Sequence, residues 1–397
     1  MTTLDQDTAP PWRLDIPEPT DLHALLAIED VPEMEQIGQA VATFAGETID
    51  AVPMDAPQEF MVWFMRMSVR GLPSDLAVWI EHPSDDLLSV AEVEGGIVLG
   101  VQTMLSADDP LTHFVNLFRL IAGSLPEVCG IGDLVTGRWH PREVIDNYYL
   151  SDETEPAESV LWVTHHLHDR DVVCTNGLAR CGRAELAMID VPDEDAAAAV
   201  DLIDGVAALS LESALPEVGV AMELGHELTV SLRDWEQLPT SDIPMPGPCG
   251  VIAAVDGGFP TDVLQRMRQG DASIARTMRS TRRRAVSARD TWDLVLTVAR
   301  LIGQRDDAAC LVQVPYAAED DANGRREHLW FRIVDQDGQS VIAELAHAPR
   351  VAQGLTPGHR ETIARDDITD WLVMTPIGPL GTDDIDAIHD FVDQLGG

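Results

Sequence analysis

Imidazole and thiol side chains gather in one stretch of the chain: His165, His166, His168, Cys174 and Cys181. Imidazole and thiolate are ligands that zinc prefers, so these residues are candidates for a metal site. On a strand, however, His166 and His168 point to the face opposite His165. The two cysteines stand seven positions apart, farther than in a zinc knuckle. We therefore favour a polar strand end with buried cysteines over a metal site, and we expect no cofactor.

A second group of charged and aromatic residues lies near the end of the chain: Glu327, His328, Trp330, Asp370 and Trp371. If the strands that carry them fold back on each other, these residues form a small pocket for a ligand or a partner protein. The alternative is structural, with a tryptophan that plugs a small β core and a hydrogen bond between His328 and Asp370. The pattern favours the structural interpretation.

The familiar motifs of enzymes are missing from the sequence. It has no G-x-S-x-G elbow, no Walker loop, no G-x-G-x-x-G turn and no H-E-x-x-H helix. The pair His226-Glu227 opens like the last of these but lacks the second histidine. Whether the protein is an enzyme stays open, and the sequence leans against it.

Acidic residues dominate the chain unevenly. The net charge is −42, and all basic residues other than histidine are arginines. Residues 1–265 carry 47 acidic residues and 10 arginines, whereas residues 266–397 carry 21 and 16. An acidic surface repels nucleic acid and anionic membranes, so we expect neither as a partner. It serves either solubility alone or the recognition of a basic protein.

Eight arginines lie between Arg266 and Arg289, against the single acid Asp271. Docking onto the protein's own acidic part explains this segment with the fewest assumptions. A solvated helix face is one alternative, and contact with phosphate or nucleic acid is another.

Hydrophobic periodicity indicates an α+β fold, with one or two sheet-and-helix domains followed by a small β-rich C-terminal domain. Helices are expected at 32–45, from Pro110, at 193–215 and at 291–302. Strands are expected at 60–67, 76–80, 95–102, 130–139, 160–165, 172–175, 185–191, 228–232, 251–255, 311–314, 329–334 and 341–345.

The expected domains follow from these elements and from the linkers between them. We expect a flexible arm at 1–21 and an α+β domain at 22–150. Residues 151–265 form a second domain or the second half of the first, and residues 266–397 form a β-rich domain that opens with an arginine-rich helix. No secretion signal is visible, and no run of about 18 apolar residues could span a membrane. With five scattered cysteines, the expected location is the cytoplasm.

Two stretches are similar to known bacterial domains. The segments 161–165 and 175–192 resemble a T-H-G-L-x-R-x-G-x-P-E-L-E motif of uncharacterised bacterial proteins, with Asn176 and Ala184 in place of the motif's histidine and proline. The segments 327–333, 355–360 and 368–372 resemble the YegJ-like domain of unknown function. This second resemblance covers roughly 270–378. Neither resemblance implies an activity.

The uneven charge and the missing motifs favour a non-enzymatic intracellular binding or regulatory protein. A specific form of this hypothesis is an immunity-like protein whose acidic face covers a basic effector, since opposite charges speed association and restrict partner choice. The alternative is an enzyme or small-ligand binder with its site near Glu327, His328, Asp370 and Trp371. The sequence leaves the ligand, the partner and the oligomeric state open.

Overall fold

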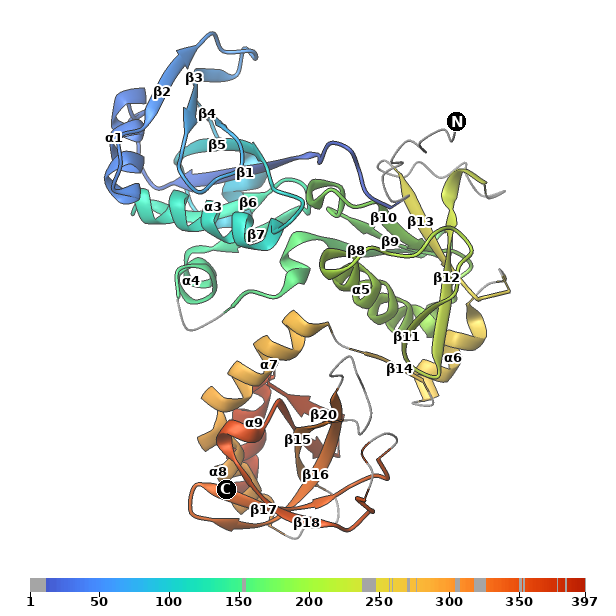
Figure 1. The fold of residues 1–397 in the computed structure, drawn as a ribbon. Helices are drawn as coiled ribbons and strands as arrows, with labels where there is room; N and C mark the ends of the chain where they lie inside the picture. The colour runs from blue at the N-terminus through green and yellow to red at the C-terminus, as the bar shows by residue number, and fades with distance from the viewer. Residues whose placement is uncertain are drawn as a thin grey trace, which may run out of the picture. The chain divides into compact units, whose positions relative to one another are not determined.

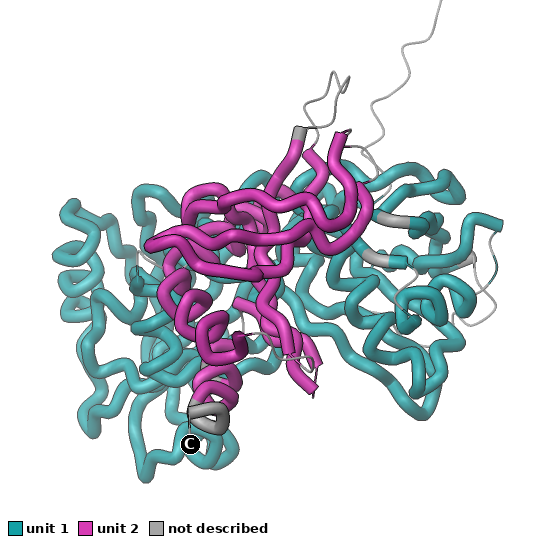
Figure 2. The backbone as a smooth tube through the Cα atoms, turned by 90° about the horizontal axis from the view of Figure 1, so that it is seen from below, with its two compact units in different colours: residues 1–277 teal, residues 278–397 magenta. Residues whose placement is uncertain are grey.

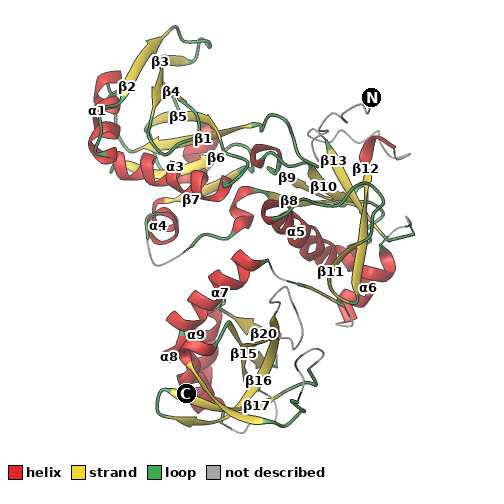
Figure 3. Cartoon of the chain, in the orientation of Figure 1, coloured by secondary structure: helices red, strands yellow, loops and turns green. Residues whose placement is uncertain are grey.

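The computed structural model describes most of the chain, and Figure 1 labels most of its elements. The described residues exclude 1–11, 152–154, 238–247, 257, 259, 270–271, 276, 304–307, 318–325, 350–351, 353, 377, 383 and 397. The chain divides into two compact units, residues 1–277 and residues 278–397 (Figure 2). Both units combine helices with mainly antiparallel sheets, so the fold is α+β, as the sequence predicted (Figure 3).

The first half of unit 1 is a seven-stranded antiparallel sheet in the order β2-β3-β4-β5-β1-β6-β7. Its strands are β1 (Pro19–Leu26), β2 (Asp50–Met54), β3 (Met61–Ser68), β4 (Leu76–Glu81), β5 (Ile97–Met104), β6 (Val128–Asp133) and β7 (Arg138–Pro141). The first strand of the chain therefore lies inside the sheet, paired with β5 on one side and β6 on the other.

The helices of this half are α1 (Met34–Ala45), α2 (Asp85–Ala91), α3 (Pro110–Ser124) and the short α4 (Arg142–Val144). Helix α3 begins at Pro110, where the side chain of Asp109 accepts a hydrogen bond from the amide of Thr112. Aspartate at the cap and proline in the first turn both favour a helix start. The helix predicted from Pro110 buries one apolar face, and α1 packs beside it (Figure 1).

The second half of unit 1 is another seven-stranded sheet, in the order β14-β11-β12-β13-β10-β9-β8. Its strands are β8 (Val163–Leu167), β9 (Val172–Asn176), β10 (Glu185–Met188), β11 (Met222–His226), β12 (Leu228–Asp234), β13 (Cys249–Ala253) and β14 (Ser273–Ile274). Strands β10 and β13 are parallel, and the other pairs are antiparallel. Helix α5 (Ala196–Glu212) covers one face, and α6 (Thr261–Gln269) contacts α5.

One hydrophobic core runs through both halves of unit 1, from Trp12 to Ala272. Of the segment 1–21, expected to be a flexible arm, the structure describes residues 12–21, which contact the rest of unit 1. Trp12 is buried and donates its indole N–H to the carbonyl of Pro216 at 2.7 Å, and Pro19 opens β1. Burial of a tryptophan ring removes a large apolar area from water, which holds this segment against the core.

Unit 2 is a six-stranded antiparallel sheet in the order β18-β17-β16-β15-β19-β20, with helices on one side. Its strands are β15 (Ala309–Ala317), β16 (Arg326–Asp337), β17 (Ser340–Leu345), β18 (Arg360–Ala364), β19 (Asp370–Thr375) and β20 (Gly378–Gly381), and its helices are α7 (Met278–Asp290), α8 (Trp292–Ile302) and α9 (Ile385–Gly396). Gly338 and Gln339 form the turn that joins β16 to β17, with Gly338 at a φ of 63°. The small β-rich C-terminal sheet is thus confirmed.

Several elements differ from the sequence prediction. The single strand expected at 130–139 is a hairpin, because the carboxylate of Asp133 accepts hydrogen bonds from the Val135 amide and the Thr136 hydroxyl and turns the chain. Residues 158–161 form a 3₁₀ turn before β8. The arginine segment is divided, because β14 pairs with β11 and interrupts it: α6 belongs to unit 1 and α7 to unit 2. Residues 239–247 of the proline-rich linker lie outside the described residues.

None of the helices within the described ranges combines the length and apolar character needed to cross a lipid bilayer.

Candidate functional site

The five C-terminal candidates lie in two different environments. Trp371 is fully buried, and its indole N–H donates to the hydroxyl of Thr291 at 2.9 Å. Asp370 is also fully buried and accepts hydrogen bonds from Arg284 at 3.5 Å and from the amide of Trp371 at 2.9 Å. Both side chains belong to the interior that joins the sheet to α7 and α8.

The next two candidates hold neighbouring loops. The Nδ1 atom of His328 lies 2.9 Å from the hydroxyl of Thr369, the residue before the carboxylate expected as its partner. The Glu327 carboxylate accepts a hydrogen bond from the amide of Ala352 at 2.8 Å. Four of the five candidates therefore have structural contacts, which leaves Trp330.

Trp330 lines a pocket of about 710 Å³ on the sheet of unit 2. The pocket floor comes from neighbouring strands. In the antiparallel register Leu311 lies opposite both Arg332 and Leu372, and Arg332 lies opposite Glu344. Residues directly opposite each other share a face, so these side chains are presented together. The alternation of side chains along β16 places Trp330 and Arg332 on one side of the sheet, and this could be predicted from the sequence. Their partners on the neighbouring strands depend on the register and could not.

Of the two charged side chains Glu344 and Arg332 that line this pocket, only Glu344 has an ion-pair partner among the described residues. The Glu344 carboxylate accepts hydrogen bonds from the Arg360 guanidinium, at 3.0 Å from Nε and 2.9 Å from the terminal nitrogen. Arg332 is exposed and has no hydrogen bond or ion pair with another side chain that the structure describes. The pocket therefore combines apolar side chains with the paired carboxylate of Glu344, the imidazole of His347 and the guanidinium of Arg332, which is available to an anion.

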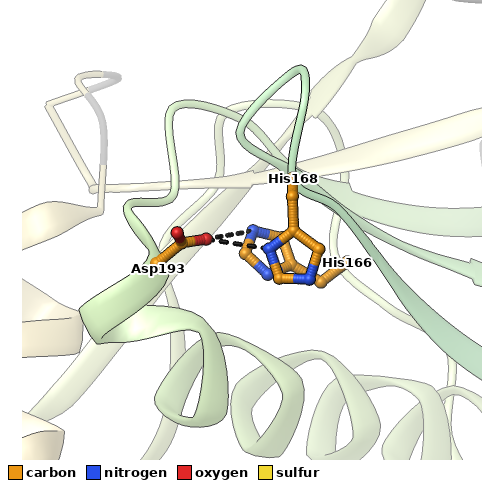
Figure 4. A group of neighbouring side chains, drawn as sticks. All are labelled: His166, His168 and Asp193. Carbon is orange, nitrogen blue, oxygen red and sulfur yellow. Dashed lines mark hydrogen bonds and ion pairs between the residues drawn. The ribbon is translucent and has the colours of Figure 1, made fainter.

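The histidine group of unit 1 lies at the edge strand β8. His166 and His168 share a face, as predicted, and their ring centroids are 4.0 Å apart. Asp193, on the 3₁₀ turn before α5, approaches both: its Oδ1 is 2.8 Å from His168 Nδ1 and 3.9 Å from His166 Nε2 (Figure 4). The hydrogen bond from His168 lowers the pKa of the Asp193 carboxyl. Sequence spacing gave no sign of Asp193.

The cysteines do not join these histidines. Cys174 pairs with His165 across the β8–β9 ladder, so it shares the face of His165 and packs into a small core with Val172 and Trp235. Cys181 is fully buried, and this burial raises the pKa of its thiol to about 12. A thiol that resists ionisation is a poor metal ligand at neutral pH.

The stretch that resembles the T-H-G-L motif is a buried polar network. The Glu185 carboxylate accepts hydrogen bonds from the amides of Gly177 and Ala179, both at 2.9 Å, and from the hydroxyl of Thr175. Asn176, which replaces the motif histidine, donates to the carbonyl of Val135 at 2.6 Å. Burial raises the pKa of Glu185. These contacts fix the loop between β9 and β10.

Residues 275–394 match the family model described as an uncharacterized protein conserved in bacteria (DUF2314). The C-terminal part is thus similar to an uncharacterised bacterial domain, as the sequence indicated. The search of curated proteins and the search of solved structures each gave no match to the chain.

Proposed function

We propose that the C-terminal unit binds a small amphipathic anion in the pocket on its sheet. The observation that carries this proposal is the guanidinium of Arg332, which has no ion pair among the described residues, beside the apolar side chains of Leu311, Trp330, Leu372 and Met374. Glu344 and His347 also line the pocket. We also propose that this unit is similar to the YegJ-like domain of unknown function.

The chemistry of the lining supports such a ligand. Pockets of roughly 300–1,000 Å³ with apolar walls and a few polar groups are typical small-molecule sites. The ring of Trp330 offers a flat apolar face, and a guanidinium binds a carboxylate or sulfonate through two parallel hydrogen bonds. We propose binding rather than catalysis, because the nearby carboxylates of Glu327 and Glu344 already accept hydrogen bonds.

The test is a titration of the full-length chain with 8-anilinonaphthalene-1-sulfonate, an aromatic anion whose fluorescence rises in apolar surroundings, with decanoate as competitor. We expect Trp330→Ala and Arg332→Gln each to weaken binding by roughly tenfold, the worth of one charge-assisted contact. Arg326→Gln is the matched control, because Arg326 is exposed on the same strand and face but about 20 Å away. Equal affinity in all variants would contradict the proposal.

A second candidate function is recognition of a basic protein in the cytoplasm, in the manner of an immunity protein. The observation behind it is that residues 29–94 expose twelve carboxylates and only two arginines, Arg66 and Arg70. Complementary charge speeds association and makes it sensitive to salt. Affinity purification from the host with washes of rising salt tests this candidate. A basic partner lost at high salt supports it, and a partner retained through the washes argues against it.

A further inference from the structure

Two imidazoles and one carboxylate converge where β8 meets the start of α5 (Figure 4). Their potential ligand atoms all lie within 4.8 Å of one another. We propose that His166, His168 and Asp193 bind a first-row divalent metal ion, with zinc as the best-suited cation. This site is separate from the pocket of unit 2 and does not depend on it.

The strongest observation is an unsatisfied nitrogen. The side chain of His166 is only 10% exposed, and its Nε2 atom is buried without a hydrogen-bond partner among the described residues. The nearest carboxylate oxygen, of Asp193, is 3.9 Å away, too far for a hydrogen bond. A buried polar atom without a partner destabilises the folded state, and a metal ion between the two groups would remove that cost.

The neighbouring charges leave Asp193 for the imidazoles. Arg268 lies 3.1 Å from Asp195 and 3.9 Å from Glu194, so the guanidinium compensates the two acids that follow in the chain. The pairing of Asp193 is with the histidines. The Asp193 carboxylate is thus available to share a ligand with the two imidazoles.

The two separations between Asp193 and the histidines need only small changes to close the site. Ligand atoms held at about 2.1 Å from a tetrahedral zinc ion lie roughly 3.4 Å apart. The present separations of 2.8 and 3.9 Å would each change by about half an ångström. His168 and Asp193 are 72% and 77% exposed, so their side chains can move without disturbing the core.

The ligand set also defines the kind of site. Two imidazoles and one carboxylate are ligands of zinc and of ferrous iron, and three protein ligands leave coordination positions for water. Structural zinc sites are closed by four protein ligands, usually with cysteines, whereas open three-ligand sites are typical of zinc that acts on a bound molecule.

Titration of the full-length chain with Zn²⁺, and with Co²⁺ as a spectroscopic probe, tests this proposal. We expect one equivalent to bind, with cobalt bands of nitrogen and oxygen ligation. His168→Ala and Asp193→Asn should each weaken binding by roughly tenfold or more. His165→Ala is the matched control, because this exposed neighbour points to the other face of β8. Circular dichroism checks that each variant is folded.

Three outcomes would overturn the proposal. The first is that no metal ion binds tightly in a 1:1 ratio to the protein. The second is equal binding by the wild type and both variants, which would show diffuse binding to the acidic surface. The third is a thiolate-to-cobalt charge-transfer band, which would assign the metal to cysteines.

Discussion

The guanidinium of Arg180 and the carboxylate of Asp133 form a bidentate ion pair, with both N–O distances at 2.9 Å and both side chains fully buried. Asp133 ends β6 in the first sheet, and Arg180 lies on a 3₁₀ turn beside the second. Arg180 also donates to the carbonyl of Leu161 and lies over the ring of Phe114. The pair therefore joins the two halves of unit 1 through their shared interior.

Removing one charge of this pair should destabilise the protein strongly. For Asp133→Asn we expect a loss of about 3–5 kcal/mol in the free energy of unfolding, because the variant leaves the Arg180 charge buried without compensation. Urea unfolding of the full-length chain measures this loss. The control is Asp146→Asn, which breaks the exposed pair with Arg142 and should cost less than about 1 kcal/mol. Similar losses in the two variants would contradict the prediction.

A glycine in the motif-like stretch should resist substitution. Gly177 has a φ of 122°, and an added Cβ would lie 2.5 Å from the carbonyl oxygen of Leu161. Both the backbone strain and the clash with main chain oppose a side chain, so Gly177→Ala should cost about 2 kcal/mol or more. Gly132→Ala is the control, because its nearest neighbour would be the Trp139 ring at 3.7 Å. Thermal unfolding compares the two, and equal melting temperatures would refute the argument.

The free energy of unfolding should decrease as the pH is lowered, because of one buried histidine. Burial lowers the pKa of His140 to about 4 from its usual 6.5. Between these values the unfolded chain binds the proton more readily than the native state, so stability is lost as pH falls from 6.5 toward 4. The full contribution is about 3 kcal/mol. Unfolding of the wild type and of His140→Gln at pH 7 and pH 5 measures it, and the variant should lose less stability on acidification.

The two tryptophans that the sequence singled out should behave differently. Trp371→Phe leaves part of a fully buried site empty and removes the donor to Thr291, which should cost about 1–3 kcal/mol. Trp330→Phe, in the open pocket, should cost less than about 1 kcal/mol. Denaturant unfolding of the full-length variants tests this order. The reverse order would place Trp330 in the core.

Local patterns predicted the longer helices α1, α3, α5 and α8 because their residues carry the signal within a few turns. In α3, Phe114, Phe118 and Ile121 recur at helical spacing, and all are buried as expected. Strand β1 escaped prediction because Pro17 and Pro19 suggest a loop, whereas Pro19 opens the strand, a position at which proline is tolerated.

The candidate sites include contacts that local sequence patterns could not predict. Alternation along β8 placed His166 and His168 on one face, but Asp193 reaches them only through the packing of α5 on the sheet. In unit 2 the alternation of β16 pairs Trp330 with Arg332 on one side. The apposition of Leu311 and Leu372 requires the register of three strands, and that register depends on contacts between distant parts of the chain.

The interior position of β1 has a consequence during synthesis. Its apolar residues Leu22, Leu25 and Leu26 pair with β5 and β6, which the ribosome makes much later. The 78 residues between the end of β1 and the end of β5 take roughly 4–16 s to translate. Over that interval the nascent chain carries a hydrophobic strand without its pairing partners, so β1 can enter the sheet only after β5 has been made.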